Sequence, residues 1–405
     1  MVPDGWKKGI IENIAKVSSG GTPSRQNDSY WNGGHIPWVT TAEVKFGVIT
    51  NTEQKITAEG LKNSSAKLFP KQTILMAMYG QGKTRGQVAK LGIEASTNQA
   101  CAALLLSDGF DVDYYYHYLV NQYENIRELA NSGGQQNLSA GIIKGIHIPI
   151  PPFLEQQKIA NILSTWDKAI STTERLIDNS KQQKKALMQQ LLTGKKRFTG
   201  FTEKWKEYRL EQLTDFKRGK GLSKGALLNT GVNKCILYGE LYTKYPEVIK
   251  NVISRTDSAD GVKSITGDVL IPSSTTTSGI DLANATALYE SNILLGGDIN
   301  ILRINKDLIN SEFIAHVLTH AKKYEIASKA QGITIIHLYN SDLKHIKISI
   351  PAMLEQQKIG TVLANVTKET KLLEQQLADL QQEKKALMQQ LLTGKRRVSI
   401  IKQGE

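Results

Sequence analysis

The stretch PPFLEQQKI at residues 151–159 recurs at residues 351–359 as PAMLEQQKI. A second stretch, KKALMQQLLTGK at residues 184–195, recurs without change at residues 384–395. Both recurrences have the same offset of 200 residues (351 minus 151), and self-similarity at a fixed period is the signature of a repeated structural unit. The 405-residue sequence therefore predicts two tandem copies of one unit.

The same register extends into the regions that precede these motifs. Trp6-Lys7 and Trp205-Lys206 open the two halves. Five further positions match across the repeat, with Leu138, Lys144, Ile146, Ile148 and Ile150 corresponding to Leu338, Lys344, Ile346, Ile348 and Ile350. Each copy is therefore a variable globular half followed by a nearly identical segment.

The nearly identical segments are predicted to be long helices. Residues at steps of three and four form a coiled-coil pattern in the first copy: Ile159, Ile162, Trp166, Ala169, Thr173, Leu176, Leu187 and Leu191. The second copy repeats the pattern with Val366, Leu373, Leu380 and Leu387. Prolines 151 and 152 favour a helix start and Gly194 favours its end. Because a whole globular half lies between the helices, we expect them to pack antiparallel, with a domain at each end.

Ordinary core packing or a dimerisation zipper would also account for an apolar helix pattern. Packing alone does not require the polar residues Lys184, Gln189 and Gln190 to recur unchanged in the second copy. We interpret the identity as two copies of a surface that binds one kind of partner, although recent duplication or gene conversion would also produce it. The predicted partner-binding residues are Leu187, Gln190, Leu191, Leu387, Gln390 and Leu391.

The two variable halves are predicted to be mixed α/β. Each contains short β-rich runs, such as residues 73–76 and 268–271, with turn-rich connections and a few helices, such as residues 113–129. The expected fold is α/β, with two mixed α/β domains separated by a long antiparallel helix pair in a pseudo-twofold tandem repeat. The expected segments are a first domain at 1–151, a helix at 152–198, a second domain at 199–350, a helix at 351–398 and a tail at 399–405.

The charge balance favours a polyanionic partner. Lysine and arginine number 51 against 38 acidic residues, which gives a formal net charge of +13. Such a field attracts nucleic acid at long range. A net charge that only maintains solubility is the alternative, and composition does not separate the two.

Cysteine content and hydropathy indicate the cellular compartment. Cys101 and Cys235 are the only cysteines, so neither a disulfide framework nor a cysteine-rich zinc site is expected, and a reducing cytoplasm fits. No apolar stretch reaches the roughly 18 residues of a membrane span, and the first eight residues lack the apolar core of an export signal. We expect a cytoplasmic protein with no membrane partner.

Two loops in each half carry side chains suited to reading DNA. These loops are SSGGTPSR at 18–25, YGQGKTRGQ at 79–87, KRGKGLSK at 217–224 and SSTTTSG at 273–279. Arginine and lysine can bind guanine edges, glutamine can bind adenine, and hydroxyl groups can bind bases or phosphates, although solvated turns share this composition. The predicted DNA-binding residues are Ser19, Thr22, Ser24, Arg25, Tyr79, Gln81, Lys83, Thr84, Arg85, Gln87, Lys217, Arg218, Lys220, Lys224, Ser273, Ser274, Thr275 and Thr276.

Several features together resemble the specificity subunits of type I restriction-modification enzymes over nearly the whole chain. They are the tract from Trp31 to Trp38, IPIPPFLEQQK at 148–158, the two ALMQQLLTGK endings and the order of the two copies. The resemblance implies that each variable half is a target-recognition domain that reads one part of a bipartite site in double-stranded DNA. It also implies that the helices set the gap between the half-sites and bind two methyltransferase (M) subunits, and that restriction (R) subunits join the complex.

Motifs that superficially indicate catalysis are incomplete. Residues 79–84 nearly spell a phosphate-binding loop, but Ala77 replaces its first glycine and a strand is expected afterwards in place of a helix. Glu43-Val44-Lys45 and Glu383-Lys384-Lys385 resemble nuclease fragments only by chance. His316 and His320 share a helix face without the glutamate of a zinc peptidase, and are interpreted as packing or surface histidines. We expect a non-catalytic protein without cofactor or metal.

Two other functions remain open at this level. One is a stand-alone regulatory or architectural DNA-binding protein that dimerises through its coiled coil. The other is a catalytic nuclease. A protein that purifies as a homodimer with full DNA affinity, and not together with a methyltransferase subunit, would support the first alternative. Plasmid nicking in the presence of magnesium would support the second.

Overall fold

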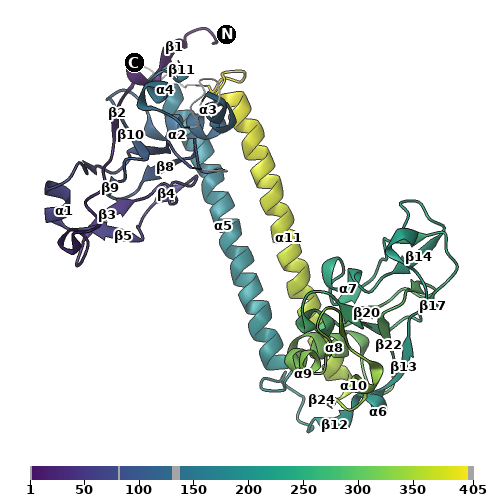
Figure 1. Ribbon diagram of the computed structural model, residues 1–405. Coiled ribbons are helices and arrows are strands. Elements are labelled where there is room, and N and C mark those ends of the chain that lie inside the picture. Colours follow the sequence, from purple (N-terminus) through teal and green to yellow (C-terminus); the bar gives the residue numbers. More distant parts are fainter. Residues whose placement is uncertain (1, 81–82, 130–136, 400–405) are drawn as a thin grey trace. The chain divides into compact units, whose positions relative to one another are not determined.

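The computed structural model describes residues 2–80, 83–129 and 137–399. The chain forms two compact units: unit 1 comprises residues 1–174 and 375–405, and unit 2 comprises residues 175–374 (Figure 1). Each unit contains one globular half together with parts of both long helices. The compact units thus divide within the helices, whereas the segments expected from the sequence divide where the helices begin and end.

Unit 1 contains one sheet with the strand order β2-β10-β7-β8-β4 and a second with the order β5-β3-β9-β6. Their bounds are β2 Ala15–Ser19, β3 Ile36–Val39, β4 Val48–Ile49, β5 Gln54–Ile56, β6 Leu68–Phe69, β7 Ile74–Ala77, β8 Val88–Leu91, β9 Ala95–Thr97 and β10 Cys101–Leu106. β1 (Lys7–Ile10) pairs antiparallel with β11 (His147–Ile150). The helical segments are η1 Ile11–Asn13, η2 Asp28–Tyr30, α1 Ala58–Lys62, α2 Val112–Asn121, α3 Tyr123–Leu129 and α4 Ala140–Lys144.

Unit 2 repeats the order of both sheets, as β13-β22-β18-β20-β15 and β16-β14-β21-β17, and also contains the two-stranded sheet β19-β23. The strands are β12 Lys206–Arg209, β13 Thr214–Arg218, β14 Asn233–Ile236, β15 Val248–Ile249, β16 Arg255–Thr256, β17 Val262–Lys263, β18 Asp268–Pro272, β19 Ser274–Thr275, β20 Thr286–Leu288, β21 Leu294–Leu295, β22 Ile299–Ile304, β23 Ile336–His337 and β24 Lys347–Ile350. The helical segments are α6 Leu210–Leu213, η3 Lys224–Ala226, α7 Glu240–Thr243, η4 Gly279–Ala283, α8 Ser311–His316, η5 Val317–Ala321, α9 Lys323–Ser328 and α10 Asn340–Lys344.

The directions of the strands also match between the units. The parallel pairs β4–β8 and β3–β9 in unit 1 recur as β15–β20 and β14–β21 in unit 2. β12 pairs with β24 as β1 pairs with β11. The two halves therefore share one mixed α/β fold, as the repeat predicted.

A buried central strand divides the apolar side chains of each unit between two clusters. In β7, Ile74 and Met76 face the cluster that includes α2, whereas Leu75 and Ala77 face the second sheet. β18 repeats this arrangement, with Leu270 in the cluster on the second-sheet side. Alternation follows from the two-residue period of a strand, and burial on both faces explains why these runs are continuously apolar.

The two long helices are α5 (Phe153–Leu191), teal in Figure 1, and α11 (Met353–Leu391), yellow. In unit 1, Asp167 of α5 pairs with Lys384 of α11. In unit 2, Ser180 hydrogen-bonds Thr370 over 2.7 Å, and Lys181 pairs with Glu374 over 2.8 Å. α5 begins in unit 1 and ends in unit 2, whereas α11 begins in unit 2 and ends in unit 1. Within each unit, the beginning of one helix therefore lies beside the end of the other. The antiparallel packing expected from the sequence is confirmed.

The predicted helix seam was wrong at one position. Leu176 is 47% exposed, and the neighbouring Ile177 is buried instead. Nine buried or partly buried positions of α5 follow a regular three-four spacing: Leu163, Trp166, Ile170, Thr173, Ile177, Ser180, Lys184, Leu187 and Leu191. The predicted seam residues Ile162 and Ala169 are also partly buried. Ser180 and Lys184 are polar but occupy seam positions in this spacing. A seam predicted from apolar residues alone passed over them and therefore placed Leu176 in the seam in place of Ile177.

The recurring glutamate of the LEQQK motif is held by an arginine that follows the other helix. Arg397 donates from Nε and Nη2 to the carboxylate of Glu155 over 2.6 and 2.8 Å. Arg197 binds Glu355 in the same bidentate way, over 2.9 and 2.6 Å. Both glutamates are buried. Each repeat therefore contributes its glutamate to one pair and its arginine to the other.

The glutamine that follows binds the start of a domain helix. The Gln156 side chain accepts from the backbone N–H of Asp111 over 2.9 Å, and Asp111 caps α2. Gln356 accepts from Asn310, the residue that caps α8, over the same distance. These contacts within the chain explain the recurrence of Glu-Gln in the motif without a partner protein.

Candidate nucleic-acid interface

The two predicted DNA loops of unit 1 leave the same edge of its main sheet. Ser19 at the end of β2 faces Ala102 in β10, and Cys101 faces Ala77 at the end of β7. The loops that follow β2 and β7 therefore start at the same edge, on either side of β10. A hydrogen bond from the Met78 backbone N–H to the carbonyl of Ala100 joins this edge to the segment before β10.

Arg25 is positioned by two tryptophans in the first of these loops. Its guanidinium carbon lies 3.7 Å from the ring centre of Trp31 and 4.9 Å from that of Trp38. Trp31 donates to the carbonyl of Ser24 over 3.0 Å, and the buried Trp38 donates to that of Gly21 over 2.9 Å. A planar guanidinium held against aromatic faces while remaining exposed is preorganised for bidentate recognition of guanine or phosphate.

The other predicted residues of unit 1 differ in exposure. Ser19, Ser24, Tyr79 and Lys83 are exposed. Thr22 is partly buried and donates to Gln99 over 2.5 Å. Thr84, Arg85 and Gln87 are also partly buried, and Gln81 lies outside the described residues. Gln99 precedes β10 and is distant in sequence from Thr22, so neither predicted loop indicated this contact.

Unit 2 places its loops at the equivalent edge. Arg218 at the end of β13 faces Asn300 in β22, and Pro272 at the end of β18 faces Ile299. The exposed candidates here are Lys217, Arg218, Lys220, Lys224 and Thr276. Arg218 pairs with Asp298 over 3.0 Å, and Lys220 lies 4.0 Å from Asp260. These exposed pairs are weak and can be exchanged for phosphate contacts.

Three predicted DNA-binding residues of unit 2 are buried. The side chains of Ser273, Ser274 and Thr275 are almost completely inaccessible. Ser274 and Thr275 form β19, which pairs with β23 through the register Ser274 to His337. The run of hydroxyl residues resembles a turn in sequence, but it lies beneath a returning strand. In this structure the three side chains are therefore not accessible for the DNA contact that the sequence predicted.

Residues 331–340 return to the loop edge of unit 2 and contact both predicted loops there, a placement that the sequence did not predict. The backbone N–H of Leu338 donates to Ser273, and the side chain of Asn340 donates to the carbonyl of Lys217 over 3.0 Å. Tyr339 is exposed and stacks on His337 with ring centres 5.9 Å apart. The only signal in the sequence was the match of Leu338 to Leu138, which marks the end of the segment and not its chemistry.

The predicted partner-binding residues fall into two classes. Leu191 and Leu391 are buried in the hydrophobic clusters of their units, and Leu187 and Leu387 pack against those clusters. Packing within the chain therefore accounts for the leucines. Gln190 and Gln390 are exposed, so their side chains remain available for the predicted contact with a partner.

Lys184 and Lys384, which recur as polar residues of the repeat, do not lie freely on the helix surface. Both side chains are largely buried. Lys384 pairs with Asp167, and Lys184 lies 3.6 Å from Glu247. Half-buried ion pairs explain why lysine recurs at this helix position.

Two of the segments that resembled catalytic motifs have structural roles. β8 follows the loop at residues 78–87 and pairs antiparallel with β7, which confirms the expected strand and rules out phosphate-loop geometry. Glu43 accepts from the backbone of Thr40 and Glu53 and so closes a turn. Among the described residues, no helix is both long enough and apolar enough to cross a membrane.

Comparison with known proteins identifies one family. The family model described as "Type I restriction modification DNA specificity domain" matches residues 3–180 and 202–382. The type I restriction enzyme MjaIX specificity subunit of Methanocaldococcus jannaschii is 32% identical over 46% of this chain and 42% of its own length. The MjaVIII specificity subunit of the same organism is 23% identical over 98% of this chain and 94% of its own.

Solved structures share the fold. The crystal structure of the S subunit of a type I restriction-modification system from M. genitalium aligns with a TM-score of 0.61 at 18% identity and covers 96% of both chains. A chain from a structure on complex assembly and conformational transition of the type I R-M system aligns with a TM-score of 0.59 at 14% identity, over 98% of this chain and 100% of that one.

Proposed function

We propose, from the premise that this chain belongs to the type I restriction-modification DNA specificity family, that its two units read the two parts of a bipartite DNA target. The observation that carries the proposal is the twofold occurrence of one sheet topology with exposed cationic loops at the equivalent edge. In unit 1 these loops present Arg25 and Lys83, and in unit 2 they present Arg218, Lys220 and Lys224.

The protein is a non-catalytic specificity subunit, and such subunits bind DNA and act with M and R subunits. We propose that two M subunits bind this chain, one at each copy of the helix ending, through surfaces that include Gln190 and Gln390. The exposure of both glutamines at equivalent repeat positions supports equivalent contacts. The stand-alone regulator is not favoured, because the proteins that this chain is similar to are named as specificity subunits. The proposed site of action is the cytoplasm.

Arg25→Ala is expected to weaken specific DNA binding by about 1–3 kcal/mol and to relax one base position. The physical reason is the loss of a guanidinium that Trp31 and Trp38 hold in one orientation. The measurement is the affinity of the assembled methyltransferase for the native site and for sites changed at one base pair.

Arg25→Lys is the matched control, since it keeps the charge and removes the bidentate geometry. If Arg25 reads a base with its planar guanidinium, lysine will not fully restore discrimination at that position. An Arg25→Ala variant that loses affinity equally for every site, with the loss recovered by lysine, would show that Arg25 only contacts phosphate.

We further propose that the helices set the gap between the half-sites. Adding one heptad to both α5 and α11 lengthens each helix by about 10 Å, which corresponds to roughly 3 base pairs at 3.4 Å each. Seven residues nearly preserve the facing direction of the seam. The expected result is an unchanged pair of half-sites with a longer gap, and the extra rotation of about a third of a turn is expected to lower activity. An active variant that kept the original gap would contradict this role of the helices.

A further inference from the structure

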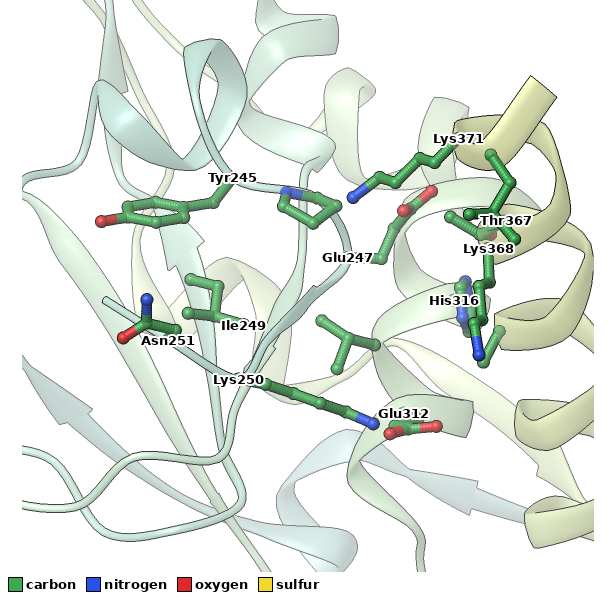
Figure 2. Close-up of a pocket in the computed structure, with 14 residues that line it drawn as sticks. Tyr245, Glu247, Ile249, Lys250, Asn251, Glu312, His316, Thr367, Lys368 and Lys371 are labelled. Carbon is green, nitrogen blue, oxygen red and sulfur yellow. The ribbon is translucent and has the colours of Figure 1, made fainter. Parts of the chain in front are cut away.

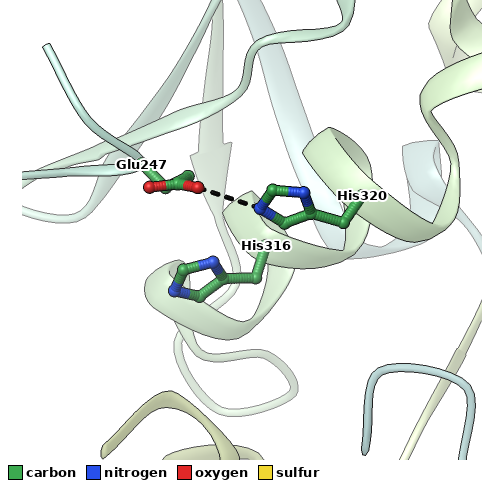
Figure 3. Close-up of side chains that lie close together, drawn as sticks. All are labelled: Glu247, His316 and His320. Carbon is green, nitrogen blue, oxygen red and sulfur yellow. Dashed lines mark hydrogen bonds and ion pairs between the residues drawn. The ribbon is translucent and has the colours of Figure 1, made fainter. Parts of the chain in front are cut away.

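Three potential metal ligands converge in unit 2, away from the loop edge. Glu247 precedes β15, His316 ends α8, and His320 lies in η5. One ligand atom from each lies within 4.8 Å of the other two. Figure 3 shows the Glu247 carboxylate hydrogen-bonded to His320 Nε2, over 2.9 Å, with His316 alongside.

The helix geometry at the two histidines is unusual. η5 is a π-helical turn, Val317–Ala321, in which the Lys322 N–H bonds the carbonyl of Val317 over 2.9 Å. Such turns are rare and are enriched at functional sites. Here the turn continues directly from α8, and the rings of His316 and His320 stack with centres 5.9 Å apart.

His316 is available as a ligand in this cluster. It is 2% exposed, and its Nδ1 atom has no hydrogen-bond partner among the residues that the structure describes. Imidazole nitrogens and carboxylate oxygens are both ligands that Zn²⁺ accepts in proteins.

We propose that Glu247, His316 and His320 form a binding site for a zinc-like transition-metal dication, a role independent of DNA reading. Two histidines and one carboxylate are a common protein ligand set for Zn²⁺ that leaves a fourth position open. A cavity of about 530 Å³ adjoins Glu247 and His316 and provides room for that fourth ligand (Figure 2). Bound metal would connect the segment before β15 to the α8–η5 turn.

Lysines around the site act against the metal. Lys184 lies 3.6 Å from Glu247, and Lys368 and Lys371 line the adjoining cavity. Lys184 therefore competes with the cation for the same carboxylate. Its repeat equivalent, Lys384, pairs instead with Asp167, and Thr367 stands at the matching position in unit 2. Removing the charge of Lys184 should consequently tighten metal binding.

The test is titration of the chelator-treated full-length chain with Zn²⁺ by calorimetry, and with Co²⁺ by visible absorption. We expect one ion per chain, at least tenfold weaker binding in His320→Ala and Glu247→Gln, and tighter binding in Lys184→Met. His345→Ala is the control, because His345 is exposed and lies outside the cluster. Circular dichroism of each variant establishes that it is folded.

Zn²⁺ should also raise the melting temperature of the wild type and of His345→Ala, but not that of His320→Ala, because a ligand that binds only the folded state stabilises it. The proposal is overturned if the wild type takes up no stoichiometric ion, or if folded His320→Ala and Glu247→Gln bind it as tightly as the wild type.

Discussion

Lowering the pH from 7 to 4 is expected to destabilise unit 1 by about 3 kcal/mol through His117 alone. This histidine of α2 is buried, and burial lowers its pKa from 6.5 to about 4 in the folded chain. At 1.36 kcal/mol per pKa unit, the difference corresponds to about 3 kcal/mol. Asp167 and Lys384 lie nearby with opposing effects on the pKa of His117.

The sign follows from proton binding. Between pH 6.5 and 4 the unfolded chain binds a proton at His117 that the folded chain excludes, so stability falls as the pH falls through this window. Above pH 6.5 both states are neutral, and below pH 4 both are protonated. The stabilisation is therefore fully present above about 6.5 and fully lost below about 4.

The measurement is urea unfolding at several pH values, compared between the wild type and His117→Gln. Glutamine cannot titrate, so its stability should fall less steeply between pH 6.5 and 4, whatever its stability at pH 7. His35→Gln changes an exposed histidine and should keep the slope of the wild type. Equal slopes for His117→Gln and the wild type would contradict the account.

Arg397→Met is expected to destabilise unit 1 by about 2–3 kcal/mol. The substitution leaves the buried Glu155 carboxylate without the two guanidinium hydrogen bonds. Removing one partner of a buried ion pair costs roughly 3–5 kcal/mol. The Arg397 side chain is 43% exposed, so water can solvate part of the site and the expected cost is lower.

The double variant Glu155→Gln with Arg397→Met separates charge from packing. Glutamine removes the unpaired charge and can still accept from Trp6 Nε1, which lies 3.0 Å from Glu155. Urea unfolding at pH 7 should show that the double variant recovers part of the lost stability. A double variant no more stable than Arg397→Met would show that the carboxylate charge is not what the arginine compensates. Arg197→Met should destabilise unit 2 in the same direction, through Glu355.

The repeated fold was predictable because its signals are local or periodic. An offset of 200 residues, an apolar helix pattern and short β-rich runs survive in a single sequence. The exposure of Arg25 was also predictable, since it lies in a polar glycine-rich loop. Its positioning by Trp31 and Trp38 was not, because cation–π geometry depends on how the loop folds back onto β3.

The remaining features depend on contacts between distant segments. Ser273 to Thr275 resemble a turn in the sequence, but in the structure Ser274 and Thr275 pair with the strand at residues 336–337. Glu247 has no local pattern that links it to His316 or His320. Arg397 of the second repeat binds Glu155 of the first, and Arg197 of the first binds Glu355 of the second. The sequence shows that these residues recur, but it does not show that they pair across the repeats.

The central claim is that each unit reads one part of a split target, and sequencing of methylated adenines tests it most directly. The measurement compares the methylated motif of cells that carry the native M subunit with wild type, Arg25→Ala or Arg218→Ala. The account predicts a bipartite motif, with Arg25→Ala relaxing bases in one part only and Arg218→Ala relaxing bases in the other only. A continuous motif, or substitutions in both units that alter the same part, would contradict it.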